Sequence, residues 1–252
     1  MAAMSILVGT PSADVPAITA SGRRDNITVF VSMSARHPGG RDADYLAWHS
    51  LDHRPEQHRL NTLRASFRLV STPACRAARA ASDQRYDATD HLMTYLFSDV
   101  AGLEQFNELS IALVQAGRTP YVLPPVERAV YRVDGTIAAP RIKIGSDVLP
   151  WWPAKGVYVL IEQGGTSGSE FIDVPGVGGA WWGGGQQMRR PFTTRPNTGL
   201  QLTYCFLDDD PVQTADRLRP VLEKRWARSG IHPLLAAPFQ VIIPSEWDRY
   251  LP

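Results

Sequence analysis

The residues most able to do acid–base chemistry lie close together in the first quarter of the chain. On a helix, steps of three and four residues return to one face, so Tyr45, His49, Asp52 and Glu56 form a single stripe, with His53 at its edge. Imidazole has the side-chain pKa nearest neutrality, and a carboxylate beside it can hold the ring in place. The spacing therefore predicts a site in which His53, or alternatively His49, exchanges a proton while Asp52 orients the imidazole.

Two other interpretations of this stretch stay open. A solvated helix face would carry the same polar residues, with a capping histidine next to Pro55, which should end or kink the helix because it lacks an amide hydrogen. A metal site would use His49, His53 and Glu56. The sequence lacks the glutamate that follows the first histidine in zinc-binding helices, and no distant ligand is evident. We therefore expect no metal at this site.

Aromatic residues and one more histidine complete the expected pocket. Tyr45 and Trp48 belong to the same helix and would supply flat apolar walls. In residues 91–97 the side chains alternate between the two faces of a strand, which puts His91 on the same face as Tyr95. We expect these side chains to contact a small apolar or aromatic molecule beneath the helix. A plain strand-end position for His91 is the other interpretation.

The elements that must hold these residues occur twice in the chain. TYLFSD at residues 94–99 returns as TYCFLD at residues 203–208, and each copy runs from a strand into an amphipathic stretch. The apolar strand at residues 27–31 has a counterpart at residues 157–161. The second copy is shorter between its first and second strands by about 16 residues, or roughly four helical turns. In the first copy that interval holds the polar helix.

The first copy has the element order βαββαβ, the ferredoxin-like arrangement, in which both helices cover one face of an antiparallel sheet. Residues 91–97 are apolar on both faces, which is typical of a strand buried on both sides. We predict an α+β protein whose two ferredoxin-like repeats form a pseudo-dimeric barrel within one chain, the second repeat lacking most of its first helix. The expected divisions are a flexible leader (residues 1–25), the first repeat with the pocket (26–140), a linker (141–155) and the second repeat (156–252).

Composition limits the partners. The formal net charge of +1, from 26 Lys and Arg against 25 Asp and Glu, provides no basic field for a nucleic-acid backbone, so nucleic acid is not expected as a partner. No apolar run reaches the length of a membrane span. Two cysteines, Cys75 and Cys205, are too few for a disulfide-built fold. We expect a reduced cytoplasmic protein that does not bind membranes, with a homodimer as one option for its assembly.

Over residues 27–244 the expected topology resembles the dimeric α+β barrel superfamily, and the polar helix resembles its EthD-like branch. The residues that carry the second resemblance are Trp48, Asp52, His53, Pro55 and Glu56. His49 stands where that branch would have a tyrosine. The superfamily contains cyclases, isomerases, dehydratases, haem enzymes and cofactor-free monooxygenases, so the fold alone does not select an activity.

The expected function is cofactor-independent acid–base chemistry of the cyclase, isomerase, dehydratase or lyase type on a small, mostly apolar molecule. Two alternatives belong to other classes: a haem-binding or oxygen-using, monooxygenase-like enzyme of the superfamily, and a non-catalytic protein that binds a small ligand. Residues 100–115, the second helix of the first copy, contain no His, Cys or Met, whereas haem-binding relatives take an iron ligand from such a helix. We therefore expect an enzyme without a cofactor.

Overall fold

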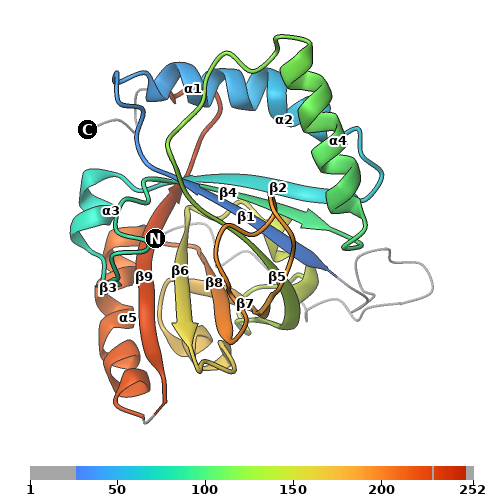
Figure 1. Cartoon of the computed structure of the whole chain (residues 1–252). Coiled ribbons are helices and arrows are strands. Elements are labelled where there is room, and N and C mark those ends of the chain that lie inside the picture. The colour runs from blue at the N-terminus through green and yellow to red at the C-terminus, as the bar shows by residue number, and fades with distance from the viewer. Residues whose placement is uncertain (1–26, 229, 248–252) are drawn as a thin grey trace.

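The structure, a computed structural model of the chain, describes residues 27–228 and 230–247 (Figure 1). Its first half alternates strands and helices, with a short helix and a two-residue strand added between the two middle strands. The elements are β1 (Thr28–Ser34), α1 (Asp42–Trp48), the π-helical turn η2 (His49–His53), α2 (Arg54–Gln57), β2 (Leu63–Val70), α3 (Pro73–Ala77), β3 (Ala81–Ser82), β4 (His91–Phe97), α4 (Gly102–Gln115) and β5 (Pro125–Ala138).

The second half has the same spatial order of its four main strands but has no counterpart of the long helix formed by α1, η2 and α2. Its elements are the 3-10 helix η3 (Ser146–Trp151), β6 (Gly156–Gln163), the 3-10 helix η4 (Ser169–Asp173), β7 (Val177–Gln186), β8 (Leu200–Leu207), α5 (Pro211–Trp226) and β9 (His232–Val241). The five-residue η4 is the only helix between β6 and β7, an interval that is fully described. The spatial order is β2-β4-β1-β5 in the first half and β7-β8-β6-β9 in the second.

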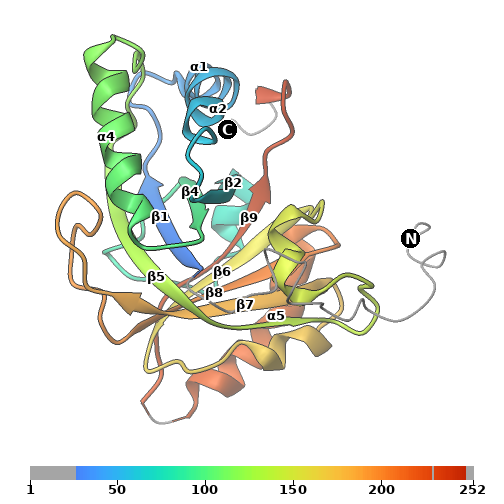
Figure 2. The same ribbon diagram turned by 90° about the vertical axis from the view of Figure 1, so that its right-hand side faces the viewer.

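Eight strands close into one antiparallel barrel. One seam between the halves is the pairing of β5 with β7 over residues 130–138 and 179–186. The other seam, between β2 and β9, is short and consists of Leu69 opposite Val241 and Val70 opposite Gln240. β3 lies outside the barrel on the edge of β9. Helices α1, α2 and α4 cover the first half, and α5 covers the second half at the opposite end of the molecule (Figure 2).

The predicted double burial of residues 91–97 is confirmed, because every residue of β4 is buried. Leu92 and Leu96 point into the barrel and join its core. Met93 and Phe97 belong to a separate apolar cluster beneath α4. The strand therefore separates two cores, and its outer face is available to form the floor of a site under the helices.

The barrel interior is filled by side chains from both halves. The hydroxyl oxygens of Thr94 and Tyr204 lie 2.7 Å apart in a hydrogen bond across it. The ring of Phe67 contacts those of Tyr204 and Phe206 edge-on, at centroid distances of 5.7 and 6.0 Å. Because these contacts join the two halves, the halves share one core.

The polar helix continues past Pro55. α1 passes into η2, whose hydrogen bonds span five residues instead of four, and the α-helical pattern returns in α2 with Pro55 in its first turn. A proline ring has no amide hydrogen and crowds the turn before it, so the wider π turn accommodates the ring. η2 also carries His49, Asp52 and His53, which places the candidate residues on a widened turn.

Two of the expected divisions, the linker and the leader, lie outside the two predicted repeats. The expected linker, residues 141–155, contains η3, whose Leu149 is fully buried. The expected leader, residues 1–25, lies outside the described residues. Within the described ranges, no helix is both long and apolar enough to cross a membrane.

Candidate functional site

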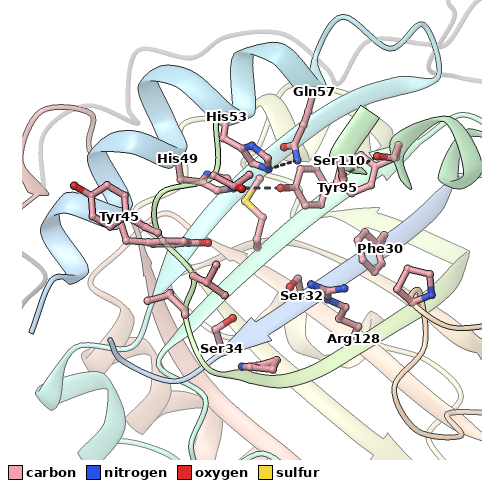
Figure 3. Close-up of a pocket in the computed structure, with 18 of the residues that line it drawn as sticks. Phe30, Ser32, Ser34, Tyr45, His49, His53, Gln57, Tyr95, Ser110 and Arg128 are labelled. Atoms are coloured by element: carbon pink, nitrogen blue, oxygen red, sulfur yellow. Dashed lines mark hydrogen bonds between the residues drawn. The ribbon is translucent and has the colours of Figure 1, made fainter. Parts of the chain in front are cut away.

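A cavity of about 300 Å³ lies between the outer face of the first-half sheet and the helices that cover it (Figure 3). Strands β1, β2, β4 and β5 supply its floor, and α1, η2 and α4 supply its walls. This volume is at the lower end of the range for small-molecule sites. The site is therefore on the helix side of the sheet, outside the barrel.

One row of side chains runs across four strands of the cavity floor. Arg68 of β2 pairs with Met93 of β4. Met93 pairs in turn with Ser32 of β1, which pairs with Arg128 of β5. Residues directly opposite on neighbouring strands share a face, and all of these line the cavity. Arg68 is only 2% exposed whereas Arg128 is exposed, so the row leads from a closed end to an open mouth.

Aromatic rings form the apolar side of the cavity. Phe30 of β1 stacks on Tyr95 of β4, with ring centroids 6.0 Å apart. Phe106 of α4 approaches both rings, at centroid distances of 5.7 and 4.7 Å, and Phe192 meets Phe30 edge-on. Flat walls of this kind favour an aromatic or planar apolar ligand.

The opposite wall is built by the polar helix. Tyr45, Trp48, His49 and His53 all line the cavity. The Trp48 ring lies 4.8 Å from the ring of His53, and the Tyr45 ring lies 5.7 Å from that of His49. The two imidazoles are 5.5 Å apart, so the wider turn of η2 presents them side by side. The Trp48 indole donates to the carbonyl oxygen of Arg118, which fixes the ring in place.

His49 is the more buried of the two histidines. It is 3% exposed, and its Nε2 lies 3.2 Å from the hydroxyl oxygen of Tyr95 in a hydrogen bond. Its Nδ1 has no protein partner. Burial, with the positive charge of Arg68 as a second cause, holds the pKa of His49 well below its usual value. The ring is therefore neutral at neutral pH.

His53 is partly buried and has a different partner. Its Nε2 lies 2.9 Å from the side-chain amide of Gln57, and its Nδ1 has no protein partner. Burial lowers the pKa of His53 in spite of the neighbouring Asp52 carboxylate, which acts in the opposite direction. The contact joins Nε2 of His53 to the side-chain nitrogen of Gln57, so Gln57 donates, His53 Nε2 accepts, and the hydrogen of the neutral ring is on Nδ1. The lone pair of the neutral ring is then on Nε2, so His53 can accept a proton there from a ligand that replaces the Gln57 amide.

Asp52 does not orient either imidazole, which corrects the role expected for it. Its carboxylate accepts a hydrogen bond of 2.9 Å from Arg118, and Glu56 lies 3.2 Å from the same guanidinium. Asp52 does not line the cavity. The π turn is the physical reason, because it changes the angular spacing that a regular α-helix would give and directs Asp52 away from His49 and His53.

His91 pairs with an acid instead of lining the cavity. Its Nε2 donates to the Asp42 carboxylate over 2.7 Å, and both side chains are buried. Burial would raise the pKa of Asp42, but the hydrogen bond from His91 and the backbone amide of His37 hold it below its usual value. Tyr95, expected on the same strand face, does line the cavity. The strand-end interpretation of His91 is thus the one that matches its position.

Several cavity residues were not identified from the sequence. Arg68, Ser32 and Phe30 reach the site from the floor, and Phe106 reaches it from α4. A signal for Arg68 exists in the sequence, since it is a charged residue within the apolar run of β2 and alternates with the buried Phe67. That signal becomes informative only when the pairing of β2 with β4 is known.

The residues present do not fit a haem in this cavity. A haem site would have to enclose the macrocycle as well as supply an imidazole ligand to its iron. A volume of about 300 Å³ is small even for a drug-sized ligand, and haem is larger. Elsewhere in the described residues, no group of three or more His, Cys, Asp or Glu side chains is arranged to hold a metal ion.

Comparisons with known proteins bear on the fold. No protein-family model and no curated protein matches the chain. A solved structure named as a chlorite dismutase matches with a TM-score of 0.51 and 10% identity, over 90% of this chain and 99% of its own. An anthrone oxidase-like protein matches with a TM-score of 0.47 and 12% identity, over 89% of this chain and 94% of its own. A protein named as a monooxygenase, from Fusobacterium nucleatum, matches with a TM-score of 0.45 and 10% identity, over 86% of this chain and 93% of its own.

At this identity the likeness shows the fold alone, an α+β fold with a closed antiparallel barrel. The chlorite dismutase neighbour carries the name of an enzyme. The expectation of cofactor-independent cyclase, isomerase, dehydratase or lyase chemistry is wrong. It used Asp52 to orient an imidazole, whereas Asp52 pairs with Arg118. The neighbour named as a chlorite dismutase also carries an oxidative name, which matches the oxidative alternative better than a lyase.

Proposed function

We propose that the protein is an oxygen-using enzyme that oxidises a small aromatic molecule in the cavity beneath α1, η2 and α4. The observation that carries this proposal is the pair of neutral imidazoles, His49 and His53, beside a cavity walled by aromatic rings. The oxidative name of the chlorite dismutase neighbour favours dioxygen chemistry over an elimination or a ring closure. Tyr45, Trp48 and Tyr95 would hold the aromatic substrate.

The chemistry begins with proton removal. His53 takes a proton through Nε2, the nitrogen that faces Gln57 in the free protein, from an acidic C–H or O–H group of the bound ring, with His49 as the alternative acceptor. The resulting anion is electron-rich and passes electrons to dioxygen. When the reacting group is a methylene, both C–H bonds and the O–O bond break, one oxygen atom becomes a carbonyl and the other leaves as water. The electrons lost by the carbon are those gained by dioxygen, so the substrate is the reductant.

Dioxygen uptake tests this function. The purified protein would be given anthrone, naphthohydroquinone and their methylated forms, which lack the acidic hydrogen, in an oxygen-electrode cell. We expect uptake with the acidic forms and none with the methylated ones. Uptake that is equal in boiled protein, or an absence of uptake with every acidic aromatic tested, would leave a cavity that only binds its ligand.

We also infer that the chain is a tandem duplication of a ferredoxin-like unit, with residues 26–140 and 156–252 as its copies and the first copy in the EthD-like branch. The identical strand order of the two halves supports the duplication. Trp48 and His53 in the cavity wall support the EthD-like assignment of the first copy. A homodimer and a cytoplasmic location stay predictions of the sequence.

A further inference from the structure

Arg68 is a buried cation for which the described part of the chain supplies no acidic partner. It is 2% exposed at the closed end of the cavity floor. Its guanidinium donates from Nη2 to the hydroxyl oxygen of Tyr45 over 2.9 Å, and its buried Nε has no partner. A guanidinium offers five N–H donors, and buried charges are normally paired. Most of the donor capacity of Arg68 is therefore unused by the protein itself.

The nearest acids of the polar helix are paired with other residues. Asp52 and Glu56 both contact Arg118, and Asp42 contacts His91. The face of the Tyr45 ring lies 5.0 Å from the guanidinium carbon of Arg68, which stabilises the cation only partly. The closed end of the cavity thus carries a positive charge that a ligand can neutralise.

We propose that the ligand of this cavity carries a carboxylate that binds the guanidinium of Arg68, with its aromatic part lying over Met93 and Phe30. A planar guanidinium matches a carboxylate through two parallel N–H···O bonds. This rests on the proposed function for the aromatic nature of the substrate and adds its chemical class, an aromatic carboxylic acid.

The floor of the cavity sets the length of such a ligand. Three strand spacings separate Arg68 from Arg128, so their backbones are about 14 Å apart. A carboxylate at Arg68 leaves room along this row for one or two fused rings before the mouth. The ring then lies within the walls formed by Phe106 on one side and by His53 on the other.

Binding of matched probes tests the carboxylate site. Naphthoate and naphthamide have the same shape and differ in charge, and their affinities would be measured by titration calorimetry under nitrogen, where no oxidation occurs. We expect the wild-type protein to prefer naphthoate by about tenfold or more, the factor that a charged hydrogen-bond pair supplies. Arg68→Met should abolish that preference and leave naphthamide binding within about twofold.

Arg64→Met is the matched control, because Arg64 belongs to the same strand as Arg68 but is exposed to solvent, where charge is screened, and does not line the cavity. The preference for naphthoate should survive in this variant. Arg68→Met should also leave the ligand-free protein at least as resistant to urea as the wild type, since it removes an unpaired buried charge. A loss of resistance would assign Arg68 a structural role and overturn the proposal.

Three results would each overturn the carboxylate site. They are equal affinity of the wild type for the two probes, a preference for naphthoate that survives Arg68→Met, and no binding of either probe at millimolar concentration. The outcome is separable from that of the proposed oxidation. A carboxylate preference without dioxygen uptake by any aromatic acid leaves the site standing and removes the oxidation. Dioxygen uptake with uncharged substrates that is unchanged in Arg68→Met, together with no preference for naphthoate, leaves the oxidation standing and removes the carboxylate site.

Discussion

The two imidazoles of the cavity are kept neutral by their surroundings, and each is placed by one neighbour. Burial and the charge of Arg68 oppose protonation of His49 and His53. Tyr95 holds one ring and Gln57 holds the other. A neutral imidazole beside a ligand cavity is suited to accept a proton from a bound molecule.

Replacing His53 should therefore affect turnover more than replacing its acidic neighbour. For oxidation of an acidic aromatic substrate, His53→Gln should lower kcat/KM by about 10²–10⁴-fold. Asp52→Asn is the control and should stay within about threefold of the wild type, because its half-exposed pair with Arg118 is worth little. Steady-state oxygen uptake checks both variants. A larger loss of kcat/KM in Asp52→Asn than in His53→Gln would favour the site in which Asp52 orients an imidazole.

The same burial predicts how stability depends on pH. A histidine whose pKa is lowered by folding binds its proton more readily in the unfolded state, so stability rises with pH in that range. The urea midpoint should fall as the pH is lowered from about 7 to about 5, below the ordinary histidine pKa. The free energy of unfolding should change less steeply with pH in His49→Gln, by up to about 1.4 kcal/mol per pH unit, the value for one proton. The exposed His232 provides the control, and His232→Gln should leave the slope unchanged.

At the scale of elements, helices are fixed to the sheets by a few specific contacts. α5 is attached to β6 through Arg225, which donates to the fully buried Glu162 over 2.8 Å. Asp210 caps the start of α5 by accepting from the amides of Val212 and Gln213. These contacts orient the helix that covers the second half, on the far side of the molecule from the cavity.

Breaking the buried pair should be costly for folding. Arg225→Met leaves the Glu162 carboxylate buried without its cation and should lower the free energy of unfolding by about 3–5 kcal/mol. Arg217→Met on the same helix is the control, because its pair with Asp209 is at the surface and should contribute no more than about 1 kcal/mol. Urea unfolding measures both. Similar losses in the two variants would show that burial does not decide the strength of these pairs.

Sequence patterns predicted the elements better than the contacts between them. The alternation in β4 is a local pattern, and the burial of both its faces is as expected. The side chains of Tyr45, Trp48, His49 and His53 were likewise predicted to lie on the cavity wall, where they are found. The partners of Asp52 and Arg68 were missed, because the π turn at Pro55 and the pairing of β2 with β4 are set by tertiary packing.

At the scale of the whole molecule, neither half has a closed core of its own. The inner face of the first sheet contributes Val31, Phe67 and Leu92 to a cluster that also contains Val159 and Tyr204. β2 and β5, the edge strands of that sheet, are both paired with strands of the second half. Separation of the halves would expose an apolar face and two strand edges.

A fragment of residues 26–140 should therefore not be stable as a monomer. We expect it to pair with a second copy or to aggregate, since the apolar inner face must be covered. Size-exclusion chromatography with urea unfolding checks this, with the full chain as the reference for cooperative unfolding. A soluble monomer with one cooperative transition would show that the first half folds without the second.

Oxidation of an aromatic molecule by dioxygen in the cavity is tested most directly with isotopically labelled dioxygen. Anthrone would be incubated with the wild-type protein and with His53→Gln, and the product analysed by mass spectrometry. The proposed chemistry requires one labelled oxygen atom in the carbonyl of the wild-type product and, in the variant, a yield lower by about 10²-fold or more. Product without label, or equal labelled yields from the two proteins, would contradict it.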